Sequence, residues 1–454
     1  MLARRLTLSQ AVCLNMAMMV GIGPFVTIPL IVKAVGGPHA LVIWVVGAIV
    51  AIADGLVWSE LASAFPGSGG TYHFYDSVYG NLRVGRLLKF LFVWQFLFSG
   101  PLEFASGAMG LTRYAGYFWP ALQDPILGFR GWIFTRGQAG AMLVIAALVA
   151  LAYRRVETTG RLMLVLGAGM VATVLWVIVA GLPRIDIGLV EGVPAGAWRI
   201  DGANLRAAGV ALGYAMYTYF GYYQVCYLGD EVVDPSRTIP RSILISVVGV
   251  SVAYVAMNVS ILGVIPWEEM QRYGDYVGSA FMGIVYGPWA AGLVTVMILW
   301  TAAAGSFAAI LGYSRVPYAA ARSGHFFRGL AATHPTGDFP HRSLLLVGGL
   351  AMVACLADLE TVLGALMASR IPIQFVGQIV TIAYIRRVPE LRAKMKFRMW
   401  CYPLPALVAL AGWLCVFAAS TRAIAAYGVG SMALGGLVFL VWDRGRGKKA
   451  ALEV

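Results

Sequence analysis

The chain has 454 residues, of which 60% are hydrophobic and only 12% charged, and its mean hydropathy is +0.77. A soluble domain carries about 25% charged residues, so the composition excludes a soluble protein and predicts an all-α integral membrane protein. The net charge of +13 does not point to nucleic acid, because the basic residues lie between the apolar stretches. Five scattered cysteines and five histidines without ligand spacing predict no disulfide framework, metal or cofactor.

The first apolar stretch, Gln10 to Ala34, is long enough to cross a bilayer but is interrupted by Gly21-Ile22-Gly23-Pro24. Two glycines followed by a proline favour two half-helices over one continuous helix. The second half-helix would begin at Pro24 and direct free N–H groups and its positive end toward an anion. The alternative is a structural helix kinked by proline.

Hydropathy predicts about twelve spans, at about 10–34, 38–65, 85–119, 137–153, 160–182, 205–229, 242–265, 280–312, 343–358, 360–385, 402–420 and 424–442. Most of the 34 lysines and arginines fall in alternate connections and in the two ends, including Arg154 and Arg155. Positive residues are enriched on the inner side of membrane proteins. The chain is therefore predicted to be a multi-pass protein of the cell (inner or plasma) membrane, with the lipid bilayer as partner and both termini cytoplasmic.

Asp54 and Glu60 both lie on the second predicted span, and three charged residues within the spans, Glu60, Glu103 and Arg370, are functional candidates. Glu60, near the inner end of the second span, is predicted to be a structural anchor or an inner-gate residue. Glu103 lies at mid-depth in the third span, where a carboxylate usually faces a cavity or a partner. It is a candidate for proton carrier, for counter-ion of a cationic substrate, or for partner of a protein cation. Arg370, also near mid-depth, is expected to pair with Glu103, to bind a carboxylate or to snorkel outward.

The sixth span contains Gly221 among bulky aromatic residues and is the second candidate break. It follows the first break by about five spans, as expected for an inverted repeat of five plus five helices. Carbonyl groups freed there are candidates to hold an ammonium group, and Tyr217, Tyr219 and Phe220 are candidates to close over a ligand. The alternative is that this aromatic stripe is packing. The turn that follows places Asp230, Glu231 and Arg237 where charges are expected to pair across an inner gate.

That turn, Gly229-Asp230-Glu231-Val232-Val233-Asp234-Pro235-Ser236-Arg237-Thr238-Ile239-Pro240-Arg241, resembles the amino acid–polyamine–organocation (APC) superfamily of transporters. The end of the second span, Glu60-Leu61-Ala62-Ser63-Ala64-Phe65-Pro66, is similar to the same family. The resemblance implies a leucine-transporter-like fold of about twelve helices with broken helices 1 and 6. Its repeats would span 8–185 and 202–388, with two accessory helices in 400–443.

The resemblance also implies a substrate site. Gly21, Ile22 and Gly23 would receive a substrate carboxylate. The sixth span would supply carbonyl groups for the amine and an aromatic gate at Tyr217, with the site formed by Tyr217, Thr218, Tyr219, Phe220 and Gly221. The usual hydroxyl residue between the glycines is replaced by Ile22, and the fifth span lacks the lysine of many proton-coupled members.

We therefore predict a secondary active transporter that moves amino acids by alternating access, coupled to protons rather than sodium. A transporter or exchanger of polyamines or cationic amino acids is the alternative. Outside transport, a transporter-like nutrient sensor or a channel is the other class. No nucleophile with a nearby base is visible, so an enzyme is not predicted.

Overall fold

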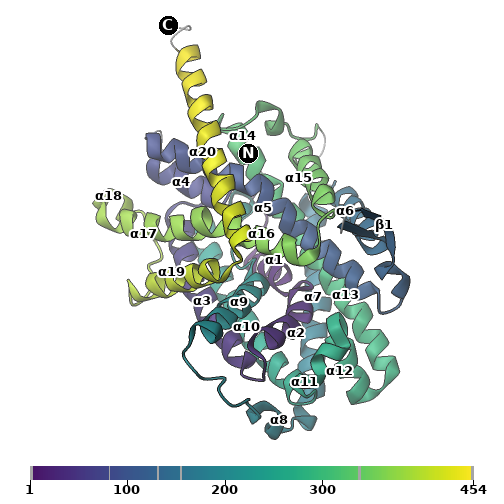
Figure 1. Ribbon diagram of the computed structural model, residues 1–454. Helices are drawn as coiled ribbons and strands as arrows, with labels where there is room; N and C mark the ends of the chain where they lie inside the picture. Colours follow the sequence, from purple (N-terminus) through teal and green to yellow (C-terminus); the bar gives the residue numbers. More distant parts are fainter. Residues whose placement is uncertain (1–3, 81, 130–131, 154–155, 336–338, 451–454) are drawn as a thin grey trace.

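The computed structural model describes residues 4–80, 82–129, 132–153, 156–335 and 339–450. Arg154 and Arg155, which were predicted to lie in an inner connection, are outside the described residues. The chain is almost entirely helical (Figure 1). The longer helices are α1 Leu8–Val20, α2 Gly23–Val35, α3 Ala40–Ala64, α5 Arg83–Ala115, α6 Arg136–Ala152, α7 Val156–Gly181, α9 Gly202–Tyr219, α10 Pro235–Leu262, α13 Pro288–Tyr313, α15 His341–Ala354, α16 Leu359–Arg370, α17 Gly377–Arg387, α19 Leu404–Ala419 and α20 Arg422–Ala450.

Short elements connect these helices. They are the helices α4 Thr71–Tyr79, α8 Ile187–Glu191, α11 Trp267–Tyr273, α12 Val277–Tyr286, α14 Arg315–Arg322 and α18 Pro389–Arg392, and the antiparallel hairpin of β1 Pro125–Phe129 and β2 Trp132–Thr135. Single turns of 3-10 helix lie at Pro120–Gln123, Leu182–Arg184, Gln224–Tyr227, Gly229–Glu231, Gly274–Tyr276 and Arg328–Ala331. A π-helical turn, Ile371–Val376, joins α16 to α17.

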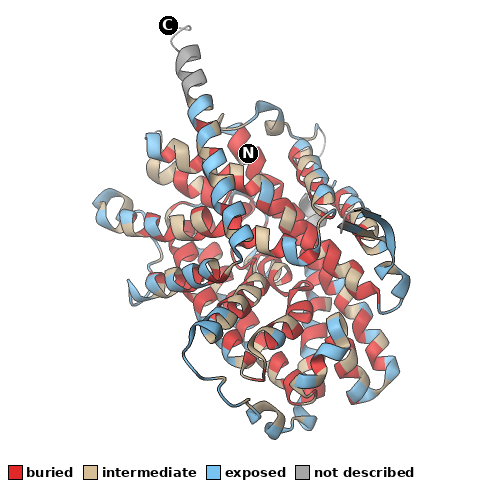
Figure 2. Ribbon diagram, in the orientation of Figure 1, coloured by how far each residue is buried: buried red, intermediate tan, exposed pale blue. Residues whose placement is uncertain are grey.

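Seven helical segments in the described part of the chain are long and apolar enough to cross a membrane, or eight if the bent pair of α1 and α2 forms one span. Three further apolar helices, α6, α15 and α19, are shorter. Buried residues fill the centre of the bundle, whereas α20 is largely exposed (Figure 2). Apolar side chains such as Leu437 and Val441 are exposed on it. An apolar exposed surface of this kind is suited to lipid, as expected of an integral membrane protein.

The eighth predicted span begins later than the sequence suggested. The expectation was a helix from about residue 280, but Gly287, with φ +93°, separates α12 from α13. Pro288 then occupies the first turn of α13, where a proline is readily accommodated. Hydropathy alone does not mark this boundary, because α12 is itself apolar.

Both predicted breaks are present. A 40° bend separates α1 from α2 at Gly21-Ile22. The sixth span stops at Tyr219, and Gly221 takes φ +115°, a conformation that favours glycine. A Cβ atom on Gly221 would lie 2.3 Å from Cγ of Met18. The two interrupted segments therefore meet side by side, which places the unwound backbone of both in one region.

The chain end preceding α1 is fastened to the segment after the second break. The N–H groups of Arg5 and Leu6 both donate to the carbonyl oxygen of Glu231 at 2.8 Å, and the Val233 N–H donates to Leu6 O at 3.0 Å. The turn at Ser68 also pairs with Leu228. We call these paired residues, 5–6, 68–70 and 226–233, the inner clasp.

Candidate substrate cavity and its gates

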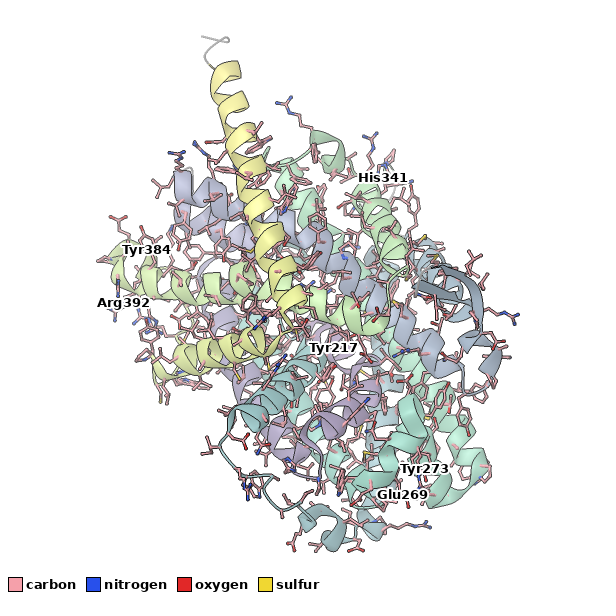
Figure 3. All side chains as sticks on the ribbon, viewed as in Figure 1. Tyr217, Glu269, Tyr273, His341, Tyr384 and Arg392 are labelled. Carbon is pink, nitrogen blue, oxygen red and sulfur yellow. The ribbon has the colours of Figure 1, made fainter. Side chains whose placement is uncertain are left out.

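A cavity of about 30 Å³ lies where the two breaks meet. Side chains and backbone from α1, α2, α5, α9 and α13 line it: Met18, Met19, Gly21, Ile22, Gly23, Glu103, Gly107, Tyr217, Phe220, Ala302, Gly305, Ser306 and Ala309. In Figure 3 the labelled Tyr217 lies near the middle of the bundle, far from the peripheral Glu269 and Arg392. By the volume that one water needs, this conformation holds water but admits an amino acid only if the lining moves.

The first break offers backbone donors to this cavity. Within the described residues, the N–H groups of Ile22 and Gly23 have no hydrogen-bond acceptor, and Pro24 carries no N–H. The Gly21 carbonyl is held by the Thr301 hydroxyl of α13, at 2.9 Å. Free N–H groups at the start of a helix are suited to an anion. The anion would be a carboxylate or a similar group on the ligand.

The predicted residues of the second break have different surroundings. Tyr217 and Phe220 line the cavity, and the Tyr217 hydroxyl lies 2.9 Å from Ser106 Oγ. The Thr218 side chain instead contacts the backbone of α9, its hydroxyl donating to Ala215 O at 2.6 Å. Tyr219 packs against other aromatic rings, and Gly221 packs against Met18. Only Tyr217 and Phe220 of this set are placed to touch a ligand through their side chains.

One hydroxyl connects the two breaks. Tyr254 of α10 is fully buried, and its hydroxyl lies 2.8 Å from Met19 O and 3.1 Å from Thr218 O. The single hydroxyl proton serves carbonyl groups of both interrupted helices, which would otherwise be buried without a donor. One carbonyl predicted to be available to an amine, that of Thr218, is therefore already engaged.

Glu103 and Arg370 form an ion pair in the wall of the cavity. The carboxylate also accepts a hydrogen bond from the Tyr313 hydroxyl. Arg370 is fully buried and donates from Nε to Ser99 Oγ at 3.1 Å and from Nη1 to the Tyr223 hydroxyl at 3.2 Å. Each residue therefore neutralises the charge of the other. Of the alternatives given above for Glu103 and Arg370, the structure shows direct pairing. Glu103 Oε2 is engaged by both Tyr313 and Arg370.

A π-helical turn directly follows Arg370. Pro372 removes one backbone donor from the tenth span, and the Gly377 N–H reaches back to Pro372 O across the wider turn. Such turns insert one residue into a helix and are frequent at functional sites. The Arg370 guanidinium stacks near Phe220 at 5.6 Å and Tyr313 at 5.2 Å, and its Nη2 has no hydrogen-bond partner among the described residues.

Two further ion pairs include predicted gate residues. Glu231 of the inner clasp pairs with Arg315 of α14 at 3.2 Å, and both side chains are at most 5% exposed. Glu60 receives two hydrogen bonds of 2.7 Å from Arg386. Its carboxylate also accepts the Met399 N–H at 2.7 Å, so it ties α3 to α17 and to the segment after it.

The other two predicted gate residues lie apart from these pairs. Asp230 is exposed, and its N–H donates to Ser68 Oγ at 3.0 Å. Arg237 is exposed and lies 4.0 Å from its helix neighbour Asp234. The sequence did not identify Arg315 as the partner of Glu231.

Removing the Arg315 charge is expected to loosen the inner clasp, because Arg315→Gln leaves Glu231 buried without its cation. Breaking a buried pair in this way costs about 3–5 kcal/mol. The buried Cys226, which lies within the clasp, is expected to react faster with a thiol reagent, as followed by mass spectrometry of the cysteine-containing peptide.

Arg237→Gln is the matched control, since exposed pairs contribute about 0–1 kcal/mol. Equal modification rates of Cys226 in the two variants would mean that the Glu231–Arg315 pair does not hold the clasp closed.

Comparison with known proteins agrees with this architecture. Residues 6–439 match the family described as amino acid permease. The chain is 32% identical to an uncharacterised transporter of Mycobacterium tuberculosis, over 80% of this chain and 76% of that protein. It is 24% identical to the human cystine/glutamate transporter, over 98% and 86% of the two chains. It is also 24% identical to the methylthioribose transporter of Bacillus subtilis, over 87% and 84%. The chain thus belongs to the amino acid permease family of the APC superfamily and is a multi-pass integral membrane protein.

Proposed function

We propose that this protein is a secondary active transporter that moves amino acids across the cell membrane by alternating access. The observation that carries the proposal is the cavity at the two breaks, with the free N–H groups of Ile22 and Gly23 on one side and Tyr217 on the other. These donors suit the carboxylate that all amino acids share. The twelve spans, the inverted repeats and the cytoplasmic termini form part of the same proposal.

The charges in the wall of the cavity indicate which net charge a substrate should carry. Arg370 neutralises Glu103, so the site carries no net charge from this pair, which favours amino acids that are neutral overall. The Arabidopsis relative at 24% identity is named a vacuolar cationic amino acid transporter, and a cationic substrate remains the second candidate, because Glu103 also lines the cavity. Protons are the proposed coupling ion, since the residues around Thr301 and Ser306 supply few oxygen ligands for sodium.

Filling the first break tests the proposal. Gly23 lies so close to Thr218 that a Cβ atom would be 3.2 Å from Thr218 Cγ2. Gly23→Leu is therefore expected to push the two breaks apart, to distort the cavity between them and to abolish both amino acid binding, measured by thermal shift, and uptake into proteoliposomes. A ligand that binds at 100 times its Kd stabilises the folded wild type by about 2.7 kcal/mol, and this increment should vanish.

Gly249→Leu is the control, since no atom lies within 4 Å of a Cβ atom at Gly249 on α10. Normal affinity in folded Gly23→Leu would remove the first break from the substrate site. Stabilisation by polyamines alone would favour the cationic candidate. Binding without uptake by the wild type would favour a sensor.

A further inference from the structure

A second intramembrane carboxyl group, outside the substrate cavity, has no cationic partner. Asp54 lies in the middle of α3 and is 1% exposed. The Tyr222 hydroxyl donates to its Oδ2 at 2.5 Å, and Oδ1 has no hydrogen-bond partner. The indole groups of Trp58 and Trp413 face the same carboxyl, but neither N–H makes a hydrogen bond to it. Asp54 is thus surrounded by uncharged groups.

Within the described residues, the buried or part-buried titratable side chains of the elements packed around Asp54 are tyrosines, Cys226 and one closed ion pair. They include Tyr219 on α9, Tyr222, Tyr223 and Tyr227 after α9, Tyr254 on α10, and Glu60 with Arg386 between α3 and α17. The other arginines of these helices, Arg206, Arg237, Arg241 and Arg387, are exposed. Among the residues that the structure describes, no ion pair within 4.0 Å includes Asp54. A carboxylate buried without a cation is costly, whereas a protonated carboxyl with one hydrogen bond is tolerated. The protonated form of Asp54 therefore suits these surroundings better than the carboxylate.

The position of Asp54 connects this proton to the cavity. Tyr222 directly follows Gly221, the residue at which the sixth span is broken. Trp413 stacks on Phe375 with ring centroids 3.9 Å apart, and Phe220 of the cavity lining lies 5.4 Å from Phe375. The carboxyl group, the second break and the cavity wall are consequently in continuous contact.

We propose that Asp54 is the proton-binding residue that couples movement of the second break to the pH gradient, an inference that rests on the transport function proposed above. Proton binding forms only an O–H bond on the carboxylate. Loss of the proton leaves a charge that requires water, and water reaches Asp54 only if Tyr222 and Trp413 separate from it. Protonation thus permits the cavity to close as well as to open, whereas the deprotonated carboxylate keeps it open. Glu103, whose charge is already compensated by Arg370, is less suited to this task.

Asp54→Asn tests the proposal, because asparagine has the shape of the protonated acid and no exchangeable charge. In proteoliposomes the variant is expected to exchange internal for external amino acid at equal pH, as the wild type does, but to lose accumulation driven by an inward proton gradient. Glu268→Gln, at an exposed acid on α11, is the control and should accumulate substrate normally.

Infrared difference spectroscopy gives an independent readout. Wild type should show the C=O band of a protonated carboxyl at neutral pH, and Asp54→Asn should lack it. If that variant does not fold, Tyr222→Phe should shift the band to higher frequency, since the carbonyl loses its donor. The proposal is overturned if folded Asp54→Asn retains gradient-driven accumulation, if it loses exchange as well, or if the band is absent from wild type. A wild type that transports no amino acid would instead refute the proposed function, and the infrared band would still decide whether Asp54 holds a proton.

Discussion

Glu103→Gln is expected to destabilise the protein by about 3–5 kcal/mol, because it leaves the guanidinium of Arg370 buried without a counter-charge. Arg370 is fully buried, and its remaining contacts are neutral hydroxyl groups and aromatic rings. These contacts orient the cation but do not neutralise it. The loss is measured from reversible unfolding in a lipid–detergent mixture, as the change in the free energy of unfolding.

The double variant Glu103→Gln/Arg370→Met is the decisive control. Replacing both members of a buried pair by uncharged residues of similar volume is often neutral or stabilising, so the second substitution should restore most of the lost stability. A single variant as stable as the wild type would show that water or another group compensates Arg370. A double variant no better than the single would assign the loss to packing around Tyr313 rather than to charge.

Gly305→Ala is expected to impair substrate binding and transport more than any other glycine-to-alanine change in α13. A Cβ atom at this position would lie 2.8 Å from Gly21 Cα and 3.0 Å from Ala17 O, both of which are backbone atoms and cannot rotate away. Overpacking of this kind costs about 1–3 kcal/mol. If α1 must move away from α13 to relieve it, the affinity for substrate falls roughly ten- to a hundredfold.

Gly249→Ala provides the comparison, because the same added methyl group on α10 meets no atom within 4 Å. Alanine is the better helix former, so this control should be at least as stable as wild type and should bind amino acid normally. Isothermal titration of both variants measures the difference. Equal affinities would show that the first break tolerates displacement and is not held in place by α13.

The breaks could be predicted because their cause is local. Gly21, Gly23 and Pro24 act on their own backbone, and the structure bends the helix there by 40°. The charge of Glu103 was likewise visible as an anomaly in an apolar span. Its pairing with Arg370 was one of several alternatives, since the contact depends on how the third and tenth spans are rotated and on a π-helical turn that hydropathy does not register.

The sequence did not identify the hydroxyl groups that form hydrogen bonds between helices. Tyr254 lies among aliphatic and small residues of α10 and Tyr313 at the end of α13, and nothing in their neighbours along the chain marks them as donors to Met19 O or to Glu103. Thr301 donates to the Gly21 carbonyl, a contact that its position in an apolar span does not reveal. A polar contact between helices depends on the angle between them, and that angle is a property of the assembled bundle.

The inner clasp also has a consequence for how the protein is made. Residues 5–6 leave the ribosome well before their hydrogen-bond partners at 231–233, which are synthesised about 225 residues later. Until then the backbone groups of residues 5–6 lack these partners, because contacts between segments far apart in the sequence form late. The clasp is therefore completed late in biogenesis, and a nascent chain arrested before residue 231 would expose Leu6 to a protease that the finished protein resists.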